Sequence, residues 1–156
     1  MVFRKSYVLP LLLSGFFFAL DQILKYVAHT GSTPPLYLIR PWLGWEYFGN
    51  LGIAFSIPFP NILLIIGTPV VLLLLLSYVG KKATIVTDQV FFGASLIFFG
   101  AISNLIDRIL FALTIDYIRI VTSVINIADC MIVIGTILLL VRSTKNGMVV
   151  DKKDKP

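Results

Sequence analysis

Charged residues are scarce in this chain of 156 residues. Lysine and arginine (13) together with aspartate and glutamate (8) make up 13% of it, whereas about 25% is usual in soluble domains. There is one histidine and one cysteine, and neither an HExxH nor a CxxC pattern occurs. The sequence therefore predicts no disulfide scaffold, no zinc-type metal site and no soluble enzyme domain.

Long apolar runs are what the sequence has in abundance. Hydrophobic residues make up 58% of it, and the mean hydropathy is +0.94. A helix of about 20 apolar residues crosses the hydrocarbon core of a bilayer. We therefore predict one integral membrane domain over residues 1–156, all-α in class, with transmembrane helices over 7–28, 62–79, 90–106 and 124–141.

The basic residues predict the orientation of these spans, since lysine and arginine accumulate on the cytoplasmic side. With a cytoplasmic N-terminus, nine of the 13 basic residues fall on that side: Arg4, Lys5, Lys81, Lys82, Arg142, Lys145, Lys152, Lys153 and Lys155. Both termini are then cytoplasmic, with 142–156 as a polar tail. The net charge of +5 has a topological explanation, and we expect no nucleic acid partner.

The segment 31–61 is the one long connection, and it falls outside the cytoplasm. It is rich in aromatic residues and contains short alternating pieces such as 36–39 and 45–48. Aromatic side chains suit the headgroup level of a membrane, where the rings are buried and their polar edges stay wet. We expect a small extracytoplasmic β-cradle resting on the membrane; the alternative is a plain aromatic belt that anchors the helices.

Polar residues inside the spans gather at one depth. An ionisable group at a helix centre costs about 2.5–3.5 kcal/mol on insertion scales, so each one needs a reason. In the predicted topology three helix ends bring such residues beneath the outer surface: Asp21 and Lys25, Asn104 and Asp107, and Asn126 and Asp129. Spacings of i, i+3 and i, i+4 place the members of each pair on one helical face.

Paired carboxylates are the chemistry that these residues offer. Two aspartates sharing a site cannot both ionise easily, so one keeps its proton while the other acts as a base toward water. Asp107, Asp116 and Asp129 all qualify by depth. The alternative for each is a structural cap or an ion pair with Arg108 or Arg119.

Five segments resemble the motif blocks of the lipoprotein signal peptidases, also called signal peptidase II. They occur in the family's order: Phe18–Lys25, Asn50–Phe55, Gly100–Arg108, Ile115–Ile118 and Ile125–Asp129. The resemblance implies a multi-pass aspartic endopeptidase of the bacterial cytoplasmic (inner) membrane, with its active site at the extracytoplasmic face. Such enzymes remove the signal peptide of a prolipoprotein just before its diacylglyceryl-modified cysteine.

The resemblance also implies roles for individual residues. Asp116 and Asp129 would form the catalytic dyad, and no metal or cofactor is expected. Supporting or substrate-binding residues would be Asp21, Lys25, Asn50, Gly52, Asn104, Asp107, Arg108 and Asn126. The expected partners are diacylglyceryl-modified prolipoproteins and membrane lipid, with the chain acting as a monomer.

Several departures from the family pattern concern the site. Asp116 and Asp129 are 13 residues apart, whereas the family usually has a longer connection. Substitutions relative to the usual residues occur at Ile53, Ser103, Cys130 and Tyr117. None removes a carboxylate, so they bear on loop geometry and substrate preference more than on the reaction.

Two other classes of protein would also bury carboxylates among helices. One is a small polytopic transporter, whose sites usually lie near the bilayer midplane in repeated or broken helices. Here the polar residues gather toward one face, and no repeat is visible. The other is a catalytically inactive membrane adaptor.

Overall fold

A computed structural model describes residues 5–31, 33–53, 56–81 and 87–153. Parts of the predictions lie outside these ranges. They are the basic residues Arg4, Lys82 and Lys155, and the end of the second motif block, Ala54 and Phe55.

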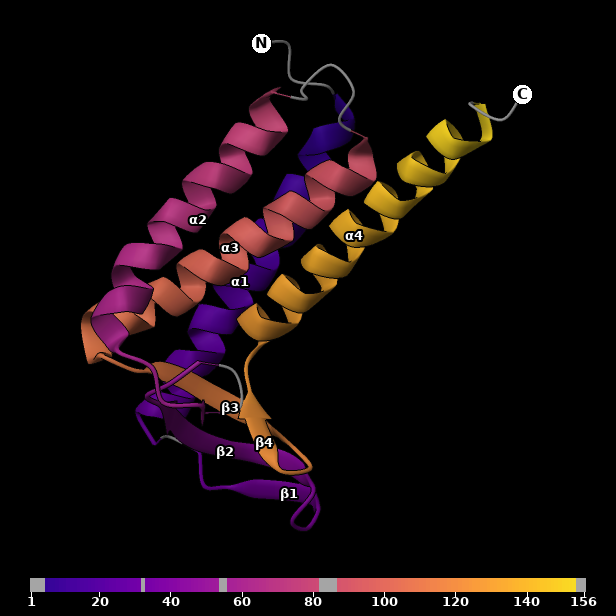
Figure 1. Ribbon diagram of the computed structural model, residues 1–156. Coiled ribbons are helices and arrows are strands. Elements are labelled where there is room, and N and C mark those ends of the chain that lie inside the picture. Colours follow the sequence, from indigo (N-terminus) through magenta and orange to yellow (C-terminus); the bar gives the residue numbers. More distant parts are fainter. Residues whose placement is uncertain (1–4, 32, 54–55, 82–86, 154–156) are drawn as a thin grey trace.

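The chain forms a helical body with a small antiparallel sheet at one end (Figure 1). A short 3-10 helix, Lys5–Tyr7, precedes α1 (Val8–His29), and α2 (Asn61–Lys81), α3 (Asp88–Phe111) and α4 (Ile127–Lys153) follow. The strands are β1 (Leu36–Ile39), β2 (Leu43–Asn50), β3 (Thr114–Ile120) and β4 (Ser123–Ile125). The prediction of a mostly helical protein with a small sheet, formed in part by the segment 31–61, is thus confirmed.

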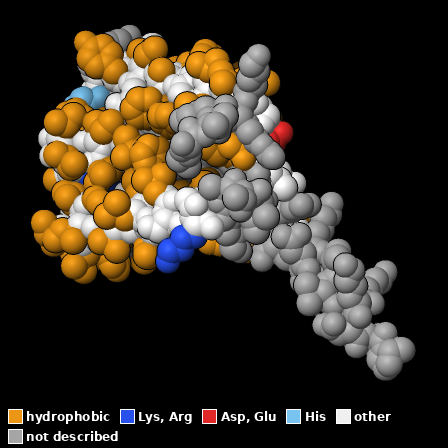
Figure 2. Space-filling view, turned by 90° about the horizontal axis from the view of Figure 1, so that it is seen from above, with side chains coloured by type: hydrophobic (Ala, Val, Ile, Leu, Met, Phe, Trp, Pro, Cys, Tyr) orange, Lys and Arg blue, Asp and Glu red, His pale blue; other side chains and the backbone are white. Residues whose placement is uncertain are grey.

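The helices expose apolar surface, as expected for a protein in a membrane. Three of them in the described ranges, α1, α2 and α3, are long and apolar enough to cross a bilayer, and Ile127–Val141 of α4 is a shorter apolar stretch. Orange hydrophobic side chains cover most of the described surface on the face shown in Figure 2. α2 buries only Leu72, whereas the buried face of α1 includes the polar side chains of Ser14, Asp21 and Lys25.

The fourth helix differs from its predicted range of 124–141. Val124 lies in β4, opposite Arg119 of β3, so the helix begins later. Asn126 caps it, because the Asn126 Oδ1 accepts a hydrogen bond from the Asp129 backbone N–H at 2.8 Å, the usual device at a helix start. At the other end the backbone stays helical beyond Val141 to Lys153, through most of the predicted tail.

Helix α3 lies at the centre of the body and contacts α1, α2 and α4. Its contact with α4 is close because glycines face backbone there. A Cβ added to Gly93 would lie 2.9 Å from the Gly135 carbonyl oxygen, and one added to Gly100 would lie 2.7 Å from that of Ala128. These glycines let α3 and α4 approach closely.

The sheet has the order β1-β2-β3-β4, with every neighbouring pair antiparallel. α3 ends where Ala112 adopts a left-handed conformation, and β3 then runs back along β2. In this register Phe48 faces Asp116 and Asn50 faces Thr114. The strand that carries Asp116 is therefore held on both sides, by β2 and β4.

A small core joins the sheet to the helical body. Ala28 at the end of α1 packs with Ile115 and Tyr117 of β3, and Trp45 of β2 covers them. The Trp45 and Tyr117 rings lie 5.0 Å apart between centroids. Alternate residues of a strand point to opposite faces, so this packing turns Asp116 away from the core formed by its neighbours.

Candidate active site

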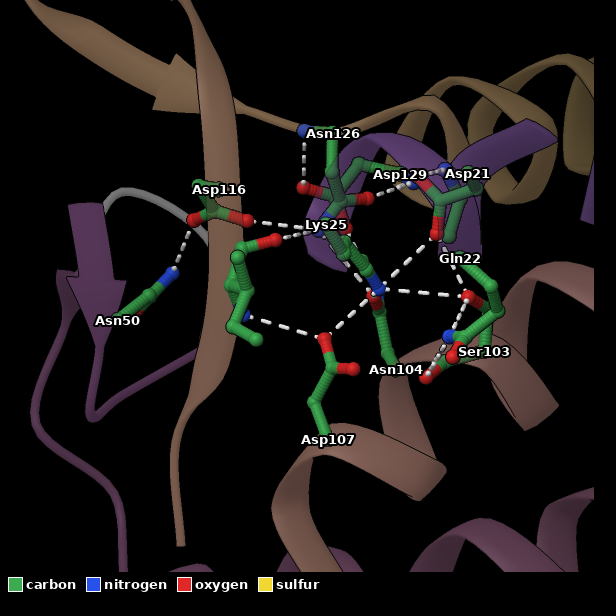
Figure 3. Close-up of polar contacts among 12 residues, drawn as sticks. Asp21, Gln22, Lys25, Asn50, Ser103, Asn104, Asp107, Asp116, Asn126 and Asp129 are labelled. Carbon is green, nitrogen blue, oxygen red and sulfur yellow. Dashed lines mark hydrogen bonds and ion pairs between the residues drawn. The ribbon is translucent and has the colours of Figure 1, made fainter. Parts of the chain in front are cut away.

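A buried ion cluster occupies the interface between α1 and α3 (Figure 3). Lys25 and Asp21 form the predicted i, i+4 pair, with Nζ 3.0 Å from the Asp21 Oδ2. The same Nζ lies 2.8 Å from the Asp107 Oδ2, and all three side chains are almost completely buried. Asp107 was a candidate for the dyad; the structure instead pairs it with Lys25, and neither Arg108 nor Arg119 is its ion partner.

Ser103 links this ion cluster to the rest of the helix interface. Its hydroxyl donates to the Asp21 Oδ2 at 2.6 Å and accepts from the Gln22 amide at 2.7 Å. The Asp107 Oδ2 accepts a backbone hydrogen bond from Ile115 at 3.1 Å. Through Asp107, the ion cluster therefore also fixes the start of β3.

Two asparagines connect the ion cluster to Asp129. The Lys25 ammonium donates to the Asn104 Oδ1 at 2.8 Å, which orients the Asn104 amide. Its Nδ2 then donates to the Asp129 Oδ1 at 2.8 Å. Asn126 donates to the same Asn104 oxygen at 3.2 Å, so both amides have a fixed direction.

Asn126 also joins the two carboxyl groups of the predicted dyad. Its Nδ2 lies 2.6 Å from the Asp116 Oδ1, and its backbone N–H lies 3.4 Å from the Asp129 Oδ2. On the far side, the Asn50 Nδ2 donates to the Asp116 Oδ2 at 3.2 Å. The structure thus brings Asp116 and Asp129 to either side of one residue, and the hydrogen-bond donors to them in the described part of the chain are amides, not cations.

The environment of Asp116 favours its protonated form. This side chain is fully buried. Burial, reinforced by the negative charge of Asp129, raises the pKa of Asp116 to about 7, against the hydrogen bonds from Asn50 and Asn126. Near neutral pH, Asp116 can therefore hold a proton that an ordinary aspartate would have lost.

Asp129 lines a cavity of about 640 Å³ that opens between α2, α3, α4 and the sheet. Its polar end is formed by Asn50, Asn104, Arg108, Thr114 and Asp129, and most of the remaining lining is apolar: Ile53, Leu64, Ala101, Leu105, Val124, Ile125, Ile132, Val133 and Ile134, together with Thr68 and Cys130. Asp116 lies behind this wall. A cavity of this kind accepts an apolar chain and brings a polar group to Asp129.

Arg108 braces the loop after β2. Its Nη2 donates to the Gly52 carbonyl oxygen at 2.8 Å, and its Nη1 lies 3.5 Å from the Asn61 Oδ1. The Gly52 N–H donates to the Asn50 Oδ1 at 2.9 Å, and a Cβ on Gly52 would lie 2.1 Å from the Ile57 carbonyl oxygen. Arg108 and Gly52 therefore hold Asn50 in place; within the described ranges Arg108 bonds neither carboxyl of the dyad.

Arg119 belongs to a different cluster, on the sheet. It forms an ion pair with Glu46, which also accepts a hydrogen bond from the Tyr37 hydroxyl. The hydrogen bond from Arg119 holds the pKa of Glu46 below its usual value. Arg119 thus has its ion partner on the sheet, and the alternative of an ion pair between Arg119 and Asp116 is wrong.

Helix α4 begins with every early N–H group occupied. The Ile127 N–H donates to the Tyr117 hydroxyl at 3.2 Å, and the Ala128 N–H donates to the Asp21 Oδ1 at 3.2 Å. The Tyr117 hydroxyl in turn donates to the same Asp21 oxygen at 2.8 Å. Free N–H groups at a helix start need such acceptors, and here a carboxylate of α1 supplies one of them.

Sequence reasoning did not assign four of these polar residues to the site: Gln22, Ser103, Thr114 and Tyr117. Ser103 could have been found, since it lies four residues before Asp107 and shares its helical face. Gln22 and Tyr117 form hydrogen bonds with residues of other secondary-structure elements, and no spacing in the sequence indicates these contacts. In the described ranges, no group of three or more His, Cys, Asp or Glu side chains is placed to hold a metal ion.

Comparison with known proteins points to the signal peptidase II family, as the motif blocks do. The family model described as Signal peptidase (SPase) II matches residues 13–145. The lipoprotein signal peptidase of Bartonella henselae is 37% identical over 152 residues, covering 88% of this chain and 90% of that protein. The lipoprotein signal peptidase of Halothermothrix orenii is 41% identical over 125 residues, covering 78% and 85%.

Solved structures agree with the fold. A bacterial membrane enzyme determined by the in meso method at 2.3 Å resolution superposes with a TM-score of 0.79 at 27% identity, covering 94% of this chain and 93% of that one. A second, at 1.9 Å resolution, gives a TM-score of 0.72 at 27% identity, covering 85% and 90%. With a family model matched over most of its length, the chain belongs to the signal peptidase II family.

Proposed function

We propose that this member of the signal peptidase II family is an aspartic endopeptidase in which Asp116 and Asp129 activate water. Its substrates are prolipoproteins, from which it removes the signal peptide just before the diacylglyceryl-modified cysteine. One observation carries the proposal: two carboxyl groups share Asn126, have no cation partner within the described ranges, and one of them, Asp129, lines the polar end of a largely apolar cavity. The comparisons give no support to a transporter or an inactive adaptor.

The two carboxyls take different parts in this mechanism. Asp129 is partly exposed and lines the cavity, so it is the ionised base that takes a proton from water. Asp116 is buried, with a pKa of about 7, so it carries the proton at the start of the cycle. A buried carboxyl that holds a proton beside a carboxyl that reaches the cavity suits acid and base catalysis.

Peptide hydrolysis then follows from the positions of these two groups. Water, deprotonated by Asp129, attacks the carbonyl carbon of the scissile amide, while the Asp116 proton supports the carbonyl oxygen. Collapse of the tetrahedral intermediate breaks the C–N bond, and the proton taken up by Asp129 goes to the leaving amine. Asn104 and Asn126 keep both carboxyls in place during these transfers, so orientation contributes to the rate.

The cavity fits a substrate that is part peptide and part lipid. Its apolar lining from α2, α3 and α4 suits a signal-peptide segment or acyl chain, and the scissile amide meets the polar end. Every residue proposed for the site comes from one copy of the chain, so we propose a monomer that forms one integral membrane domain.

We propose that the site lies at the extracytoplasmic face of the bacterial cytoplasmic membrane, with both termini inside. Lys5 at the chain start and Lys81 at the end of α2 lie at the helix ends opposite the sheet (Figure 1), and basic residues favour the cytoplasmic side. Leu38 is 78% exposed on β1. A cysteine placed there, in a Cys130→Ser chain, is expected to react with a membrane-impermeant thiol reagent in intact spheroplasts; labelling only after lysis would reverse this orientation.

The dyad is tested by Asp116→Asn and Asp129→Asn. Each change keeps the side-chain shape and removes one protonation state, so the cleavage rate of a diacylglyceryl-modified prolipoprotein should fall at least about a thousandfold. The measurement is a gel-shift assay with purified protein in detergent micelles.

Asp88→Asn is the matched control, because Asp88 is an exposed aspartate in the first turn of α3. It should cleave at the wild-type rate. All three variants should unfold at temperatures close to the wild type. Cleavage by either dyad variant within tenfold of the wild-type rate would contradict the assignment.

A further inference from the structure

Strand β3 carries a second polar side chain on the face of Asp116. Thr114 precedes Asp116 by two residues, and alternate residues of a strand point the same way. Its side chain is 2% exposed. In the described part of the chain, the Thr114 Oγ1 is the one buried side-chain nitrogen or oxygen without a hydrogen-bond partner. Such an atom carries a desolvation cost that nothing offsets, so it requires an explanation.

The polar neighbours of Thr114 are directed elsewhere. Asn50 faces it across the sheet, but its amide donates to Asp116 and to the Ile53 carbonyl oxygen, and its Oδ1 accepts from the Gly52 N–H. Arg108 donates to the Gly52 carbonyl oxygen and toward Asn61. Asn50 and Arg108 therefore lie on the same cavity wall as Thr114, and in the described ranges neither bonds its hydroxyl.

The cavity is the remaining source of a partner. Thr114 lines it together with Asp129, Asn104 and Arg108. A peptide that brings its scissile amide to Asp129 carries further backbone carbonyl and N–H groups within one residue on either side. Those groups are themselves costly to bury without a hydrogen bond. A hydrogen bond between the peptide and the Thr114 hydroxyl would satisfy both.

We propose that Thr114 is a substrate-binding residue whose hydroxyl donates a hydrogen bond to a backbone carbonyl of the prolipoprotein peptide beside the scissile bond. The inference rests on the proposed function. Threonine in a strand has more than one favourable χ1 rotamer, and a 120° rotation about the Cα–Cβ bond exchanges the positions of the substituents on Cβ. The hydroxyl meets the substrate by this rotation, without any movement of β3.

A binding measurement tests this inference without requiring cleavage. The probe is a fluorescent, diacylglyceryl-modified prolipoprotein peptide, added in micelles to the full chain with Asp129→Asn and to the same chain with Thr114→Val as well. Valine has nearly the shape of threonine and lacks the hydroxyl. We expect Kd to rise about three- to tenfold, the size of one net hydrogen bond.

The active enzyme provides a second readout. Since the hydrogen bond is made in the bound substrate and in the transition state alike, Thr114→Val should raise KM by the same factor and leave kcat nearly unchanged. The unfolding temperature should stay equal or rise, because an unpaired buried hydroxyl is gone. Loss of a purely structural hydroxyl would lower the unfolding temperature and leave Kd and KM as they were, which would overturn the inference.

Thr114→Ser and Thr114→Ala provide the control pair, and they decide the matter if the valine variant does not fold. Serine keeps the hydroxyl and alanine loses it, so Kd should rise further for alanine than for serine. Equal values in the two variants would overturn the inference. If the wild type binds the peptide but does not cleave it, the proposed function fails, while the comparison of Kd values still decides the role of Thr114.

Discussion

The site contains four buried or half-buried aspartates in two adjacent environments. Asp21 and Asp107 each lie within about 3 Å of the Lys25 ammonium. Asp116 and Asp129 receive hydrogen bonds from asparagine amides and backbone instead. The Lys25 ammonium offsets the charge of the first two carboxyl groups, whereas only neutral groups donate to the second two. In the proposed mechanism this difference separates residues that hold the structure from residues that transfer protons.

Removing Lys25 gives the largest effect that this comparison predicts. Lys25→Met leaves two buried carboxylates without their cation, and breaking a buried ion pair in this way costs about 3–5 kcal/mol. The measurement is thermal unfolding of the purified protein in detergent micelles, where the unfolding temperature should fall sharply.

Lys81→Met is the matched control, since Lys81 is an exposed lysine at the end of α2. A surface change of this kind stays within about 0.5 kcal/mol. If Lys25→Met unfolds at the same temperature as Lys81→Met, the ion cluster does not have the structural role assigned to it.

The pH dependence of cleavage tests the second pair of aspartates, Asp116 and Asp129. The mechanism needs Asp116 protonated, and its pKa is about 7, so the rate should fall as the pH rises through 7 and this proton is lost. The Asn50 hydrogen bond favours the ionised form of Asp116 and lowers its pKa. Asn50→Ala should therefore raise the pKa and move the alkaline fall of the rate upward, by about half a unit to one unit.

The test is kcat measured as a function of pH for the wild type, Asn50→Ala and Ser14→Ala. Ser14 is a buried polar residue whose hydroxyl bonds the Pro10 carbonyl oxygen within α1, and its removal should leave the alkaline limb where it was. A limb that stays in place or moves downward in Asn50→Ala would show that Asp116 is not the group that must hold the proton.

Features that depend on local spacing could be predicted from the sequence. The Asp21 and Lys25 pair follows from an i, i+4 relation, and the apolar runs gave the positions of the helices to within a few residues at most ends. Local signals also indicated part of the sheet, because the alternating pieces 36–39 and 45–48 lie in β1 and β2. The choice of Asp116 and Asp129 over Asp107 came from the family resemblance, since depth alone admitted all three.

Features that depend on packing between elements could not be predicted in this way. The pairing of Lys25 with Asp107 joins helices whose contact no spacing encodes. The start of α4 was placed too early because Val124 and Ile125 are as apolar as the helix that follows, and only their pairing with β3 makes them a strand. Tyr117 was noted as a substitution in the sequence; its link from Asp21 to the start of α4 is visible only in the fold.

The polar face of α1 also has a consequence for how the chain is made. During synthesis α1 and α2 leave the ribosome before α3, and α2 is apolar almost all round, so it offers nothing to Asp21 or Lys25. Their partners Ser103, Asn104 and Asp107 arrive with the third helix. Until then the two charged groups have only each other, and lipid is a poor solvent for them. We therefore expect the first helix to integrate stably only after the third has been made. Nascent chains truncated before residue 103 should remain bound to the insertion machinery.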